Sequence, residues 1–221
     1  MDRETEKLRT RQTKSCNLGP TTPPRHEWAI ISHMSSKPSA SERLVAPGRP
    51  QPGEYAAYYE KYVSLISATD ILGALEGQRL VMSQLLAARS EREGNFRYAP
   101  GKWAVKEVVG HINDTERIFA YRALRISRAD QTPIEGFEQD DYVKHGNFSE
   151  RTLLDLAEEF VSVRNATLGL LRSLPDAAWT RRGIANKNEV SVRALAYIIA
   201  GHEVHHRRIL EEKYLPAIPR A

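Results

Sequence analysis

Apolar residues recur every three or four positions through most of the chain after Glu54, and this spacing is typical of amphipathic helices. It predicts a short helical segment over Tyr55–Tyr62 and then four long helices, over about residues 70–92, 105–126, 149–172 and 191–214. No run of useful length alternates between apolar and polar residues, so no sheet is predicted. Four helices of about 20 residues therefore predict an all-α fold, a four-helix bundle.

Polar residues at the expected helix starts sharpen three of these boundaries. Asp70, Ser149 and Ser191 each stand where an N-cap side chain is expected, directly before an apolar-periodic segment. Before the second long helix, Ala104 occupies the position where a serine would form a capping box with Glu107. The missing side-chain cap costs that helix about 1 kcal/mol.

Two connections between the long helices are expected to be irregular. Residues 129–148 form a long polar segment, and residues 183–189 are rich in Gly, Asn and Lys, so both are interpreted as loops. Loops as long as the first are usually functional or disordered. On its length alone, we expect Phe137–Asp141 to cover a site on the bundle.

The first 52 of the 221 residues differ in composition from the rest of the chain. They hold seven of the twelve prolines, with Ser, Thr and Arg between them and a single apolar cluster of four residues. Such a segment cannot bury enough surface to offset its chain entropy, so a disordered tail is predicted for residues 1–52 and one folded domain for 53–221. Met34 is a second candidate start, and two readings of residues 1–33 stay open: an upstream start artefact or a genuine leader.

The net charge of +4 lies entirely in that predicted tail. Residues 53–221 carry 23 basic and 23 acidic side chains, which argues against nucleic acid as a partner of the folded part. No apolar run is long enough to cross a membrane, so no membrane partner is expected. Cys16 is the one cysteine, so no intrachain disulfide can form, and a reducing, cytoplasmic location is predicted.

Histidines carry the chemistry that the sequence suggests. Four of the seven fall in predicted helices, and His202 and His206 lie four positions apart, on one face and one turn from each other. Two neutral imidazoles so placed can bind one divalent metal ion, and His111 of another apolar helix can supply a third nitrogen. Such a set suits Zn²⁺, Ni²⁺ or Fe²⁺ and leaves a coordination position open for water or substrate.

Competing interpretations of these histidines remain open. His202, Glu203 and His206 also match the short metalloprotease pattern H-E-x-x-H, in which Glu203 would have to face the metal as a general base. His205 taken alone is interpreted as an ordinary packed or surface histidine. The spacing favours a metal site and ordinary core histidines about equally.

Two motifs resemble the signatures of a known family. Residues 100–112, Pro-Gly-Lys-Trp-Ala-Val-Lys-Glu-Val-Val-Gly-His-Ile, are similar to the second-helix signature of the DinB-like, YfiT-related superfamily of four-helix bundles. Residues 200–210, Ala-Gly-His-Glu-Val-His-His-Arg-Arg-Ile-Leu, are similar to its fourth-helix signature. The resemblance spans about residues 65–215 and departs from the family pattern at Ala104, where serine is usual.

The resemblance implies a histidine triad of metal ligands, which by position are His111, His202 and His206, with His205 beside them as a non-ligand. It further implies a homodimer that acts on a small-molecule substrate. Family members include thiol-dependent S-transferases and an isomerase, so the expected function is a metal-dependent transferase that uses a low-molecular-weight thiol cosubstrate on small electrophiles. A metal-dependent hydrolase and a non-catalytic metal-binding bundle in stress response are the alternatives.

Three further residues are candidates for catalysis or for support of the site. Glu107 and Asp114 each lie about one turn from His111 on the same helix, where a carboxylate can orient an imidazole. Arg122 lies three turns along the same face, where it can meet a carboxylate. Ordinary roles compete with each of these: a charge at the helix start for Glu107 and a surface salt bridge for Arg122. For Asp114 the two interpretations are about even.

Overall fold

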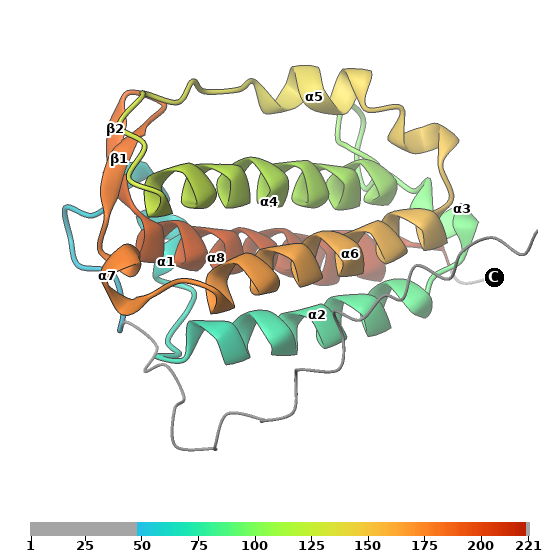
Figure 1. Ribbon diagram of the computed structural model, residues 1–221. Coiled ribbons are helices and arrows are strands. Elements are labelled where there is room, and N and C mark those ends of the chain that lie inside the picture. Colours follow the sequence, from blue (N-terminus) through green and yellow to red (C-terminus); the bar gives the residue numbers. More distant parts are fainter. Residues whose placement is uncertain (1–47, 220–221) are drawn as a thin grey trace, which may run out of the picture. The chain divides into compact units, whose positions relative to one another are not determined.

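The computed structural model describes residues 48–219, and it confirms the predicted helical bundle (Figure 1). The four long helices are α2 (Ile71–Ala87), α4 (Val105–Ser127), α6 (Leu153–Arg172) and α8 (Val192–Ile209). The shorter elements are η1 (Ala57–Tyr59), α1 (Glu60–Val63), α3 (Glu91–Gly94), α5 (Gln139–His145), η2 (Phe148–Glu150), α7 (Asp176–Trp179), β1 (Arg182–Ala185), β2 (Asn188–Ser191), the π-helical η3 (Leu210–Tyr214) and η4 (Leu215–Ala217). Of the tail predicted over residues 1–52, residues 1–47, with Cys16 and the alternative start at Met34, lie outside the described residues.

Side-chain caps begin two of the long helices as predicted. The Asp70 carboxylate accepts a hydrogen bond from the Gly73 N–H at 3.0 Å, and the Ser191 hydroxyl accepts one from the Ala194 N–H at 3.1 Å. Helix α4 has no such cap, because Ala104 offers no side-chain oxygen.

Two other helix boundaries differ from the predicted ones. Helix α2 ends five residues early because Ser90 and Glu93 form a capping box that starts the separate helix α3. Helix α6 begins after Thr152, whose hydroxyl accepts from the Asp155 N–H at 3.0 Å. The predicted cap, Ser149, lies instead inside the 3-10 turn η2.

A β-hairpin replaces the loop predicted over residues 183–189. Strands β1 and β2 pair antiparallel, with Arg182 opposite Ser191 and Ala185 opposite Asn188. Asn186 and Lys187 form the two-residue turn, both at positive φ (49° and 64°), which is the conformation that tight hairpin turns require.

The long helices α2 and α4 follow each other in the chain but are not neighbours in the bundle. Helices α2 and α4 each pack on both α6 and α8, so α2 lies diagonally across from α4. Helices α4 and α6 are neighbours that run in the same direction (Figure 1). The chain between them must therefore return along the whole of α4, which at 23 residues is about 35 Å long.

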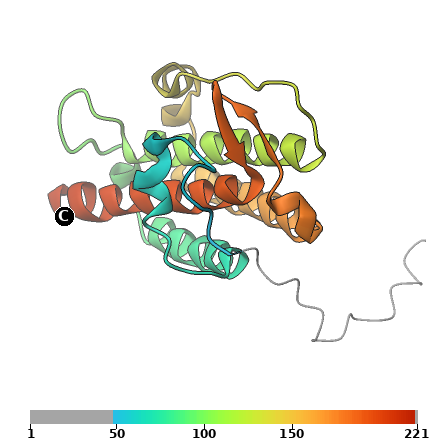
Figure 2. The ribbon, with the colours of Figure 1, turned by 90° about the vertical axis from the view of Figure 1, so that its left-hand side faces the viewer.

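Residues 128–152 make that return, and we call them the crossover. The segment predicted as a loop over 129–148 lies within it and carries the short helix α5. The hairpin holds the crossover near its start: the Ile134 N–H donates to the Ile184 carbonyl at 2.9 Å, and the Asn186 N–H donates to the Ile134 carbonyl at 2.8 Å. Figure 2 shows the hairpin standing on the bundle and reaching this segment.

Helix α8 is the most buried element, with nearly every side chain from Val192 to Val204 inside. Helix α1 lies across it, and the two backbones meet at Gly201, where a Cβ would come within 2.1 Å of the Tyr62 carbonyl oxygen. No helix within residues 48–219 is long and apolar enough to cross a membrane.

Substitution of Gly201 by alanine is expected to lower the free energy of unfolding by about 2 kcal/mol or more, because a backbone carbonyl cannot move aside as a side chain can. Gly77→Ala is the matched control, since that helical glycine has nothing within 4 Å of an added Cβ. It should raise stability by about 0.5–1 kcal/mol. Urea denaturation measures both values, and equal effects of the two substitutions would contradict the close approach of α1 and α8.

Candidate metal centre

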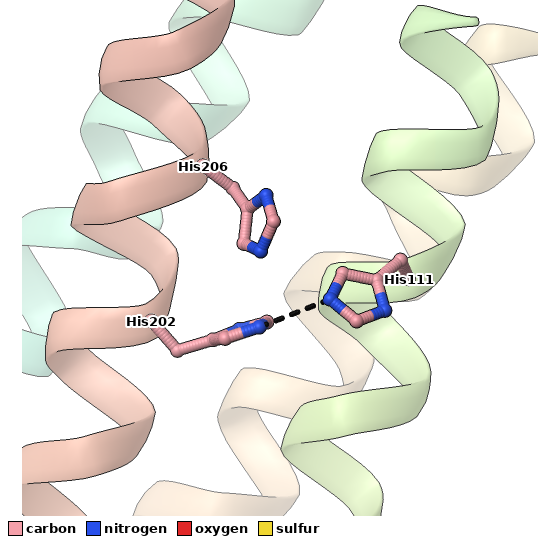
Figure 3. Close-up of side chains that lie close together, drawn as sticks. All are labelled: His111, His202 and His206. Carbon is pink, nitrogen blue, oxygen red and sulfur yellow. Dashed lines mark hydrogen bonds between the residues drawn. The ribbon is translucent and has the colours of Figure 1, made fainter. Parts of the chain in front are cut away.

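Three histidines from two antiparallel helices converge in the bundle core (Figure 3). His202 and His206 project from successive turns of α8, and His111 faces them from α4. The Nε2 atoms of His111 and His202 are 3.1 Å apart, and one ring nitrogen from each histidine lies within 4.8 Å of the others. The structure thus brings together the three residues that the sequence singled out as metal ligands.

Burial keeps these imidazoles neutral at physiological pH. His111 and His202 are 2% and 5% exposed, and His206 is half-buried. Removal from water lowers the pKa of His111 to about 4 and places those of His202 and His206 well below the usual value, with the neighbouring imidazoles adding to the shift. A neutral imidazole has the free lone pair that a metal ion needs.

The donor set fits a borderline divalent cation. Three nitrogen ligands from one side suit Zn²⁺, Ni²⁺ or Fe²⁺ and leave coordination positions open. The Thr115 hydroxyl lies 3.4 Å from Nδ1 of His111, where it can accept the Nδ1–H and so keep the Nε2 lone pair directed at the cluster. Thr115 was missed from the sequence, although its place four residues after His111 puts it on the same helix face.

Aromatic rings enclose the cluster. The Trp103 ring lies 4.9 Å from that of His111, and Tyr62 packs edge-on against His202 at 5.3 Å. Tyr62 also contacts His205, whose nitrogens are not part of the converging group. His205 therefore fits its predicted role as a packing residue beside the ligands.

A pocket of about 360 Å³ opens beside His111 and His202. One wall is the face of α4 that carries His111, Thr115, Phe119 and Arg122. The crossover contributes Phe137–Asp140, so the segment expected to cover a site does line this pocket. The remaining lining residues come from the start of the domain and from the hairpin, and were not predicted: Ala56, Tyr58, Tyr59, Tyr62, Asn186 and Asn188.

Two of the predicted supporting residues lie away from the cluster. The Glu107 carboxylate accepts from Arg97, with Nη2 at 2.9 Å, and from the Ala104 N–H at 2.6 Å, so it closes the start of α4. Asp114 is paired with Arg117 at 3.5 Å, and burial raises the pKa of its carboxyl. Of the three candidates, the structure brings only Arg122 to the pocket.

Glu203 does not have the surroundings of a metalloprotease base. It is 1% exposed and accepts a hydrogen bond from Arg207 at 3.0 Å, one turn further along α8. Burial raises the pKa of Glu203 to about 7, against the opposing charges of Arg207 and Arg164. A residue next to His202 points about 100° away from it around the helix, which accounts for this separation.

Three histidines that meet inside a helical bundle, beside a pocket, form an arrangement that bundle proteins use to hold a metal or cofactor in the core. The sequence model of the DinB superfamily matches residues 74–210, and the chain belongs to that superfamily. The resemblance seen in the two helix signatures is thereby confirmed. No curated protein matches the chain at a significant level.

Two solved structures share the fold. YfiT from Bacillus subtilis, described as a probable metal-dependent hydrolase with an unusual four-helix bundle topology, is 17% identical, with a TM-score of 0.61 over 76% of this chain and 94% of YfiT. The mycothiol-dependent maleylpyruvate isomerase is 11% identical, with a TM-score of 0.55 over 66% of this chain and 61% of the isomerase. At these identities the likeness establishes the fold.

Proposed function

We propose that His111, His202 and His206 bind one divalent metal ion and that the site activates a low-molecular-weight thiol for transfer to small electrophiles. The observation that carries the proposal is the meeting of three neutral imidazoles, of which those of His111 and His202 are buried and line a pocket of about 360 Å³. Pockets of this volume suit small organic molecules. A metal site that only stabilises the fold does not require a cavity beside its ligands.

Residues around the three histidines would support the chemistry of the bound metal. A divalent cation held by the three nitrogens would lower the pKa of a thiol, or of water, enough to favour the nucleophilic anion at neutral pH. Thr115 orients His111, and the rings of Trp103 and Tyr62 limit the access of water to the ligands. The crossover forms one side of the pocket.

Metal-dependent hydrolysis is the second candidate, and the description of YfiT favours it. The same three histidines would serve it, with water in place of the thiol. A thiol substrate is favoured by the name of the other structural relative, which uses mycothiol. A homodimer and a cytoplasmic location remain predictions from the family resemblance and the cysteine count.

The deciding experiment uses purified protein loaded with Zn²⁺, Ni²⁺ or Fe²⁺. The metal-loaded protein should accelerate the reaction of a small thiol such as cysteine with monochlorobimane, measured by bimane fluorescence and by loss of free thiol. Metal-free protein is the control and should match the uncatalysed rate. Hydrolysis of p-nitrophenyl esters without any effect on thiol consumption would favour the hydrolase. The absence of both activities would contradict both proposed kinds of catalysis.

A further inference from the structure

Arg122 is a buried cation on the pocket wall without a carboxylate partner. Its side chain is 2% exposed, and its Nη2 donates to the Glu135 backbone carbonyl at 3.0 Å. Its Nε has no hydrogen-bond partner among the residues that the structure describes, and the guanidinium contacts the side chains of Tyr59 and Phe119 but no carboxylate there. One strong donor of this guanidinium therefore lacks an acceptor.

The other two buried cations in the described part of the chain are both neutralised. Arg164 holds Glu116 through two hydrogen bonds, and Lys106 is 2.8 Å from Glu91. A guanidinium cannot lose its proton to escape burial, and an unpaired buried charge is costly. At Arg122 the burial of an unpaired charge therefore lowers the stability of the fold, whereas carboxylates offset this cost at the other two buried cations. Functional sites often carry such a cost in stability.

The position of Arg122 relates it to the histidines. His111, Thr115, Phe119 and Arg122 follow one another at spacings of four, four and three residues, which place them along one face of α4. His111 and Arg122 are 11 residues apart, or about 16 Å along the helix axis. A helical side chain slopes toward the start of its helix. The Arg122 guanidinium accordingly lies 5.2 Å from the centre of the Phe119 ring, and that ring is 6.4 Å from the ring of His202.

Acidic side chains also reach this pocket, from the crossover. Glu138 and Asp140 line it, but both are exposed to solvent, which screens their charges. The buried guanidinium is therefore the group on the α4 wall that interacts most strongly with a charged ligand in the pocket. An oxyanion that occupies the pocket would supply the negative charge that this guanidinium lacks.

We propose that Arg122 binds the carboxylate of an elongated small molecule whose other end reaches the three histidines. The carboxylate would accept a charge-assisted hydrogen bond from the Arg122 guanidinium. The assignment of the far end to a thiol rests on the proposed function, whereas the carboxylate site stands on the burial and the missing partner of Arg122. Small organic acids that carry a thiol, or that accept one, are the substrate class that this arrangement selects.

The first test compares 6-mercaptohexanoate with the neutral 6-mercaptohexanamide on cobalt-loaded protein, in which thiolate-to-cobalt absorption reports binding. The acid should bind about 10- to 100-fold more tightly than the amide, as expected for a hydrogen bond to a charged group. In Arg122→Gln the acid should lose this advantage while the amide keeps its affinity. Arg117→Gln, on an exposed part of the same helix, should keep the preference of the unaltered protein.

The second test needs no metal. Millimolar hexanoate should raise the thermal unfolding midpoint of the metal-free protein, hexanamide should not, and Arg122→Gln should respond to neither. Arg122→Gln itself should unfold at or above the midpoint of the unaltered protein, because it removes an unpaired buried charge. A large fall in that midpoint would make Arg122 a structural residue and would overturn the proposal.

The two tests separate the two proposals. If neither thiol gives the absorption but hexanoate still stabilises the metal-free protein through Arg122, the thiol function fails and the carboxylate site stands. If acid and amide bind the cobalt protein equally, or if hexanoate leaves the metal-free midpoint unchanged, the carboxylate site is wrong whatever the metal does.

Discussion

His202→Ala is expected to lower the affinity for divalent metal by at least about 100-fold, since loss of a residue that merely supports a ligand already costs 10- to 100-fold. His202 lies close to both other ligands, with its Nε2 at 3.1 Å from that of His111 and its ring centre 4.4 Å from that of His206. Metal should also stop stabilising the variant. At a metal concentration of 100 times Kd the unaltered protein gains about 2.7 kcal/mol of unfolding free energy, and the variant should gain almost none.

The measurement is chemical denaturation with and without metal, together with metal content after dialysis. His111→Ala and His206→Ala should behave in the same way as His202→Ala. His205→Ala is the matched control, because it neighbours His206 on α8 but does not belong to the converging group. Full metal content in any of the three ligand variants, or its loss in His205→Ala, would show that the site is assigned wrongly.

The bundle and the histidine pair could be predicted because both depend on spacing within one helix. An apolar residue every three or four positions defines a helix wherever the helix packs. His202 and His206 share a face at any position of α8 in the bundle, by the same rule. The third ligand needed more than spacing: His111 lies in another helix, and the family resemblance pointed to it.

The hairpin escaped prediction because its turn lacks the usual sequence signal. Two-residue turns with positive φ at both positions favour Asn-Gly or Asp-Gly, and here the pair is Asn186 and Lys187. The strands on either side have four residues each, too few to display an alternating pattern. Ile134 of the crossover, which is remote in sequence, adds an isolated β-bridge to Ala185 of this hairpin.

The order of the helices accounts for the pocket. Parallel neighbours α4 and α6 force the chain to return along α4, and the return segment passes the helix face that carries His111 and Arg122. Periodicity assigns residues to faces but does not order the helices. The burial of Arg122, which depends on that order and on the Glu135 carbonyl, therefore could not be read from the sequence.

Arg164→Met is expected to lower the free energy of unfolding by about 3–5 kcal/mol, a large part of the 5–15 kcal/mol typical of a domain. Arg164 is fully buried and holds Glu116 by two hydrogen bonds of 2.8 and 2.9 Å. Its Nη1 also donates to the Leu75 carbonyl and to Gln78, whose amide in turn donates to the Ala200 carbonyl. Arg164 thus links all four long helices, α8 through Gln78. Its loss leaves the Glu116 carboxylate buried in the core without a partner.

The same reasoning predicts that Glu116→Leu added to Arg164→Met restores much of the lost stability, because two apolar side chains can replace a buried ion pair at little cost. A double-mutant cycle from urea denaturation measures the coupling. Arg172→Met is the matched control: Arg172 lies on the same helix and pairs with Glu76 of α2, but both side chains are about half exposed. Its effect should stay within about 1 kcal/mol, and a comparable loss in both arginine variants would mean that burial does not set the strength of these pairs.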